Sequence, residues 1–125
     1  YEAGTLSQSA DAIAVGYIAG QISQGQYTVA VGESAGQVSQ GQYAIAIGEQ
    51  AGRTSQGTNA IAIGELAGGN GQGANSIVIN ASGSALNGTT GNKFYVKPIA
   101  SGSDTTNPLY YNTTTGEIYY VAPSV

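Results

Sequence analysis

The sequence has no Cys, His, Trp or Met among its 125 residues. Without His or Cys there is no imidazole base, no thiolate nucleophile and no soft ligand set for zinc, copper or iron–sulfur clusters. Any metal site would need oxygen ligands alone. The absence of Cys also excludes disulfides, without indicating a redox compartment. We therefore expect a protein that is not an enzyme and that carries no cofactor.

Charged residues are also scarce, with three basic and seven acidic side chains and a net charge of −4. Binding to a phosphate backbone requires clustered Lys and Arg, so we expect no nucleic-acid partner. No apolar run approaches the 18 residues of a membrane-spanning helix, and we expect no membrane insertion of this chain. Its first residue, Tyr1, is typical of a processed product or a fragment.

A sixteen-residue repeat fills the first 80 residues. Its five copies follow one another without insertion: YEAGTLSQSADAIAVG, YIAGQISQGQYTVAVG, ESAGQVSQGQYAIAIG, EQAGRTSQGTNAIAIG and ELAGGNGQGANSIVIN. A fixed period without length variation is typical of stacked repeats. In the next slot Lys93 stands where Ile or Val is expected, so the array is predicted to end near Asn80. We divide the chain into a repeat region, 1–80, and a non-repeat module, 81–125.

The residues within one copy indicate a β-coil. Recurrent glycines exclude a long helix, and the Ile-Ala-Ile alternation has the period of a strand. We predict strands at 28–31, 44–47 and 60–63, with weaker polar strands at 21–24 and 37–40. Glycines would turn the chain where φ must be positive. The fold class is thus all-β, a parallel β-roll or β-solenoid of about five coils stacked about 4.8 Å apart.

The Ile-Ala-Ile strand is apolar on both faces, which is the pattern of a strand covered on both sides. Ala is small enough to line the interior of a flat coil, so the branched residues are expected to point outwards. Soluble monomers avoid an exposed apolar stripe of that size, and we predict a homo-oligomer whose axis runs along the stack. The predicted interface residues are Ile13, Val15, Val29, Val31, Ile45, Ile47, Ile61, Ile63, Ile77 and Ile79.

The repeated phrases AIAIGE(Q/L)AG and TVAVGESAG resemble the head repeat of YadA-like trimeric autotransporter adhesins. The resemblance covers residues 1–80 and implies a homotrimeric β-roll whose aliphatic strand faces the trimer axis. Two features differ: the sixteen-residue period is slightly longer than is typical, and Ser-Gln-Gly lies outside the usual pattern. With the segments 75–99 and 109–120, the chain is more similar to fibre proteins of large DNA viruses and phage tails. That similarity implies an extracellular or virion-surface location.

The non-repeat module is predicted to contain a strand at Phe94–Ile99, stopped by Pro98, and a β-hairpin over Leu109–Val121 with NTTTG as its turn. Its tyrosines are expected to form a core or an interface. The alternative is a glycan-binding platform, since aromatic faces stack on sugar rings. These tyrosines are Tyr110, Tyr111, Tyr119 and Tyr120. Asn80, Asn87 and Asn112 stand in Asn-X-Ser/Thr motifs and are candidate N-glycosylation sites.

Two repeated polar columns have alternative interpretations. Glu33, Glu49 and Glu65 would stack as a solvated rim, helped by Arg53, or as a calcium ladder of oxygen ligands. The glutamines recur at Gln8, Gln24, Gln40, Gln56 and Gln72. They would form either a ligand-reading surface or, as we favour, a stabilising amide ladder. An ice-binding face would carry a threonine array, whereas the repeated columns hold Gln, Ser and Gly.

Together these features predict a non-enzymatic adhesive fibre, the shaft and tip of a trimeric viral or phage receptor-binding appendage. Its expected partners are copies of itself and a cell-surface receptor or glycan. One alternative is the head of a bacterial trimeric surface adhesin. Another is a subunit of a self-assembling extracellular filament.

Overall fold

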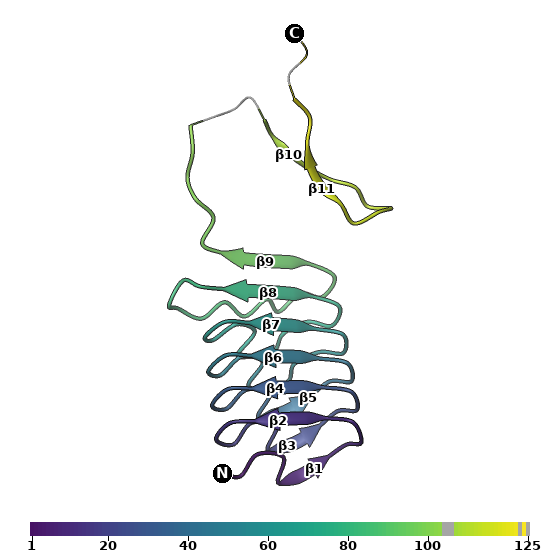
Figure 1. The fold of residues 1–125 in the computed structure, drawn as a ribbon, viewed down its shortest axis with the longest axis vertical. Helices are drawn as coiled ribbons and strands as arrows, with labels where there is room; N and C mark the ends of the chain where they lie inside the picture. Colours follow the sequence, from purple (N-terminus) through teal and green to yellow (C-terminus); the bar gives the residue numbers. More distant parts are fainter. Residues whose placement is uncertain (104–106, 123, 125) are drawn as a thin grey trace.

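The chain is an all-β parallel solenoid followed by an antiparallel hairpin, as predicted (Figure 1). The computed structural model describes residues 1–103, 107–122 and 124. The strands of the stack are β1 (Leu6–Gln8), β2 (Ile13–Val15), β3 (Ile22–Gln24), β4 (Val29–Val31), β5 (Val38–Gln40), β6 (Ile45–Ile47), β7 (Ile61–Ile63), β8 (Ile77–Asn80) and β9 (Phe94–Lys97). The hairpin consists of β10 (Leu109–Tyr111) and β11 (Ile118–Tyr120).

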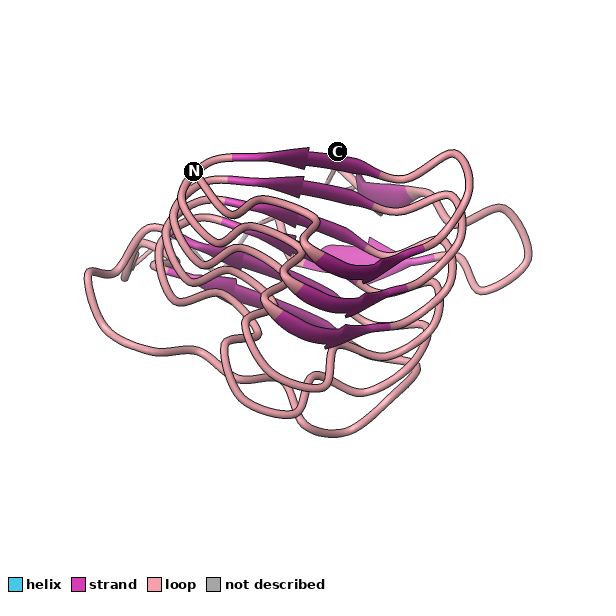
Figure 2. Cartoon of the chain, turned by 90° about the horizontal axis from the view of Figure 1, so that it is seen from below, coloured by secondary structure: helices cyan, strands magenta, loops and turns pink. Residues whose placement is uncertain are grey.

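Two parallel sheets form the walls of the stack. The larger has the order β2-β4-β6-β7-β8-β9, and we call it the aliphatic sheet; the smaller, the polar sheet, has the order β1-β3-β5. Each strand pairs with the strand one repeat later, so that Ile13 faces Val29 and Val29 faces Ile45. Figure 2, seen from the N-terminal end, shows successive coils lying over one another. Beyond β5 the polar sheet continues as single bridges through Thr54 and Asn70.

The strand positions confirm the predictions made from the repeat. The aliphatic blocks form β4, β6 and β7, and the weaker segments form β3 and β5. The glycines that follow β2, β4, β6 and β7 have a positive φ, for example 129° at Gly32. A Cβ on Gly32 would lie 2.6 Å from the carbonyl oxygen of Gly48 in the next coil. Glycine is thus required both for the turn and for the close stacking of coils.

The prediction that the stack ends near Asn80 is wrong, because β9 adds a sixth strand to the aliphatic sheet. Ile77 pairs with Phe94 and Ile79 with Val96, a step of seventeen residues instead of sixteen. This sixth turn is irregular, since Ala67 bridges to Leu86 rather than to a residue sixteen positions on. The extra residue shifts Lys93 out of the outward column, and Phe94 and Val96 occupy that column instead.

The interior of the stack is a thin ladder of small side chains. Ala30, Ala46 and Ala62 are fully buried between the walls, and Val78 takes the same position in the fifth coil. Tyr95 follows Val78 in register and is only partly buried, because no further coil covers it. The predicted placement of Ala inside and Ile or Val outside is confirmed.

The C-terminal hairpin is also confirmed. Tyr110 faces Tyr119 across β10 and β11, and their rings stack with centroids 5.8 Å apart. The turn is closed by Asn112, whose side-chain oxygen accepts hydrogen bonds from the backbone N–H groups of Thr114 and Thr115. This Asx turn explains why the NTTTG segment reverses the chain.

Candidate interaction surface

The outer face of the aliphatic sheet carries an uninterrupted apolar stripe. Period-two alternation sends one side chain inward and the next outward along each strand. The outward residues run from Ile13 and Val15 in β2 to Ile77 and Ile79 in β8, with Phe94 and Val96 added by β9. In the isolated chain Ile47 and Ile63 remain 40% and 39% exposed. All ten predicted interface residues lie in this stripe, and Phe94 and Val96 extend it beyond them.

Tyrosines border the stripe along part of both edges. Tyr27 and Tyr43 stack at 5.4 Å on the edge that precedes the strands, and Tyr1 stacks on Tyr17 on the edge that follows them. Tyr27 and Tyr43 have φ values of 59° and 61°, and Asn59 continues their column with a φ of 56°. Non-glycine residues seldom adopt this left-handed conformation, although Asn does so more readily than most. Stacked, largely exposed tyrosine rings thus lie next to the aliphatic strands in the sequence of these coils.

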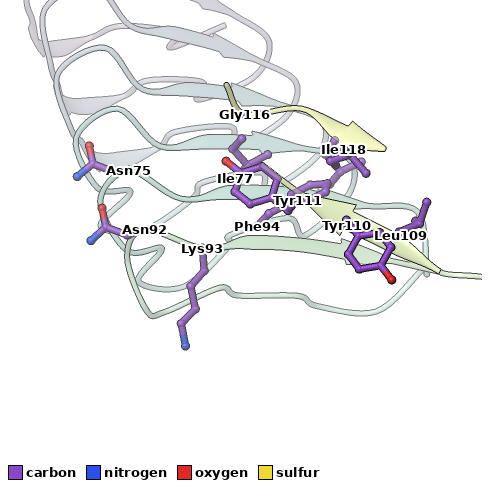
Figure 3. A pocket seen from close by; sticks show the side chains of 11 residues that line it. Asn75, Ile77, Asn92, Lys93, Phe94, Leu109, Tyr110, Tyr111, Gly116 and Ile118 are labelled. Atoms are coloured by element: carbon purple, nitrogen blue, oxygen red, sulfur yellow. The ribbon is translucent and has the colours of Figure 1, made fainter. Parts of the chain in front are cut away.

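An open groove lies between the C-terminal end of the stripe and the hairpin. Ile77, Ile79 and Phe94 form one side, while Leu109, Tyr110, Tyr111 and Ile118 form the other. Figure 3 shows Ile77, Phe94 and the labelled hairpin side chains gathered together, with Asn75, Asn92 and Lys93 to one side. The groove has a volume of about 740 Å³. Two of the tyrosines proposed for glycan binding, Tyr110 and Tyr111, line it, whereas Tyr119 and Tyr120 do not.

Four of the five repeated glutamines lie inside the stack, so they do not form a surface. Gln24, Gln40, Gln56 and Gln72 are at most 2% exposed, and only Gln8, in the first coil, is exposed. The Nε2 of Gln40 donates to the backbone oxygen of Val29 at 2.9 Å, and Gln56 bonds Ile45 at 2.7 Å in the same way. Each bond joins the polar wall of one coil to the aliphatic strand of the previous coil. These bonds support the stabilising role over a ligand-reading one.

The glutamate column lies on the surface. Glu33, Glu49 and Glu65 are all exposed. The Arg53 guanidinium donates instead to the side-chain oxygens of Gln50, at 2.7 Å, and Asn70, at 3.3 Å. Within residues 1–103, 107–122 and 124, no three His, Cys, Asp or Glu side chains lie close enough together to hold a metal ion. The column therefore has the geometry of a solvated rim.

The three candidate glycosylation sites differ in accessibility. The Asn80 side chain is 4% exposed, and its Nδ2 donates at 2.8 Å to the backbone oxygens of both Glu65 and Ser84. Its Oδ1 accepts from the hydroxyl of Ser82 at 2.7 Å. Asn87 and Asn112 are partly exposed, and each uses its side-chain oxygen as an acceptor. The folded chain thus leaves the nitrogens of Asn87 and Asn112 more accessible than that of Asn80.

Comparison with known proteins found no matching family model, no similar curated protein and no similar solved structure. The class that the fold defines is therefore a parallel β-solenoid repeat protein. The described part of the chain contains no helix with the length and hydropathy of a membrane span.

Proposed function

We propose that this chain is the shaft of a non-enzymatic adhesive fibre built from three identical copies. The observation that carries the proposal is the apolar stripe, which runs along the whole stack on the outer face of the aliphatic sheet. The six strands of the aliphatic sheet, about 4.8 Å apart, make the stripe about 24 Å long. We call the interface that copies of the stripe would form the seam. Copies that share an axis along the stack would bury the seam and extend in one direction, as a fibre shaft requires.

The total surface of the chain supports association. Its accessible area is 7229 Å², whereas a compact monomer of 12.5 kDa exposes about 6,200 Å². The excess of about 1,000 Å² comes from the elongated stack and the exposed C-terminal segment as well as from the stripe. A stable interface buries about 800 Å² on each partner, an area within this excess. The stripe and its tyrosine borders hold apolar surface of the kind found in the core of such interfaces.

The resemblance to trimeric adhesin heads and to viral and phage fibres favours three copies and a role in host attachment. A receptor or glycan would then be contacted by surfaces outside the seam. The head of a bacterial surface adhesin shares the same architecture and is the second candidate. A self-assembling filament subunit is the third, and it differs because copies would also join end to end.

Light scattering on the purified chain tests the proposal. The expected mass is that of three chains, and Ile47→Asp should reduce it to one chain because a charge would enter the seam. Ser39→Asp is the matched control: it adds the same charge on the polar sheet, at an exposed position whose φ of 57° suits Asp. A mass of one chain for the unaltered protein would exclude the fibre. A mass that grows with concentration would favour the filament.

A further inference from the structure

The groove between the stripe and the hairpin is apolar on both sides, yet its sides do not touch. Among the described strands, β10 and β11 come close only to each other. Leu109 and Ile118 on the hairpin are 74% and 57% exposed, and Phe94 opposite them is 52% exposed. The groove is open to solvent, so the apolar side chains on both of its sides remain exposed in a single chain.

The hairpin itself needs a covering surface. Its strands have three residues each, and an isolated two-stranded hairpin is marginally stable at best in water. The side of the hairpin that lines the groove carries Leu109, Tyr110, Tyr111 and Ile118 and is apolar. Packing this face against another apolar surface would stabilise the hairpin and fill the space that β8 and β9 leave open.

We propose that the groove receives the hairpin of a second copy of this chain. The exposed side chains favour this occupant, since Leu109 and Ile118 of the hairpin and Phe94 across the groove are apolar and have no covering surface within the described part of one chain. The groove also continues the stripe, because Ile77, Ile79 and Phe94 belong to both. If each chain places its hairpin in the groove of the next, the contacts close into a ring. This inference rests on the proposed function, because both require identical chains to associate.

Engineered cysteines test the exchange directly, because the chain has no Cys of its own. A chain carrying Phe94→Cys is coexpressed with an affinity-tagged chain carrying Ile118→Cys, and disulfides are analysed by non-reducing electrophoresis after mild oxidation. Only cysteines of different chains can join in this mixture. The matched control replaces Ile118→Cys with Tyr119→Cys, the adjacent residue, which does not line the groove.

The expected result is a disulfide between the tagged and untagged chains for Phe94→Cys with Ile118→Cys, in several-fold higher yield than for the control. Equal yields from the two mixtures would overturn the exchange. The exchange would also be overturned if the protein is an oligomer that gives no disulfide between tagged and untagged chains, while the double variant Phe94→Cys/Ile118→Cys forms a disulfide within one chain. A mass of one chain for the unaltered protein would overturn the proposed function as well, so the two failures are distinguishable.

Discussion

Replacing Gly36 by Ala tests whether the buried glutamine ladder holds the coils together. Gly36 has a φ of 52°, and a Cβ there would lie 2.7 Å from the Oε1 of Gln40. The substitution therefore has two costs. An L-residue in the left-handed region costs about 1–2 kcal/mol. The Gln40 amide must also move away from Val29 and Ala44, whose backbone oxygens it bonds at 2.9 and 3.3 Å.

The second cost is that of leaving buried polar groups without partners, about 1–3 kcal/mol. Gly36→Ala should thus lower the free energy of unfolding by about 2–5 kcal/mol. Gly71→Ala is the matched control, because Gly71 also has a positive φ, 73°, but nothing lies within 4 Å of a Cβ there. It should cost only the backbone share, about 1–2 kcal/mol.

Urea unfolding followed by far-UV circular dichroism, at one fixed protomer concentration, measures both variants. A double-mutant cycle with Gln40→Ala isolates the side-chain share: in that background the cost of Gly36→Ala should fall to the cost of Gly71→Ala. If Gly36→Ala alone costs no more than Gly71→Ala, within about 0.5 kcal/mol, the ladder does not contribute as argued.

Three further predictions use the same unfolding assay. Gly41→Ala would place a Cβ 2.6 Å from the backbone nitrogen of Thr58 and should lower the free energy of unfolding by about 1–3 kcal/mol. Gly102→Ala, with open space around it, should lower it by almost nothing. Equal effects of the two substitutions would contradict the close stacking of coils at Gly41. Asn59→Val should cost about 1–2 kcal/mol because φ is 56° there, whereas Asn59→Gly should keep most of the stability; the reverse order would be inconsistent with a left-handed corner. The unfolding midpoint should rise with protein concentration if the seam is buried between chains, and a constant midpoint over a hundredfold range would argue against it.

The sequence predicted the coil because side-chain size and period were both visible in it. Ala and Ile alternate in AIAI, so only one orientation fits a thin interior, and the structure places Ala46 inside and Ile47 outside. Gly at every sixteenth position predicted the turns, since glycine tolerates the positive φ observed at Gly32 and Gly48. The hairpin was predictable because NTTTG separates two short Tyr-rich segments.

The sixth turn was not predicted, because a strict period of sixteen compares Lys93 with Ile77. One inserted residue restores the match, with Phe94 and Val96 in the outward column and Tyr95 in the inward one. The ring of Tyr95 fits in the column that alanine fills elsewhere because no further coil covers it. Its hydroxyl reaches the backbone oxygen of Thr90 at 3.2 Å. Allowing one insertion at the array's end would have found β9.

The burial of the glutamines could not be predicted from their own column, because a repeated polar residue does not indicate whether its side chain faces the interior or the solvent. The available signal was the glycine four positions before each of them, as in Gly36 and Gly52. A Cβ at either glycine would meet the side-chain amide of Gln40 or Gln56, so the glycine makes the space that the amide occupies. The positive φ values at Tyr27 and Tyr43 had no comparable signal at those residues. The one signal in their column is Asn59, a residue type that favours a left-handed φ.

The thin interior explains why the association proposed above would add to the stability of this fold. Among the residues that the structure describes, nine of the ten fully buried apolar side chains are alanines. Each contributes a single methyl group, worth about 0.8 kcal/mol on burial. Together they supply about 7 kcal/mol, and the fully buried Val78 adds about 1.5–3 kcal/mol. The ten outward Ile and Val residues are already partly covered. Burying the remainder of each would add about 1 kcal/mol per residue, or about 10 kcal/mol per chain. The seam therefore offers about as much apolar burial as the core, and a chain that left it in water would give up a contribution as large as that of its core.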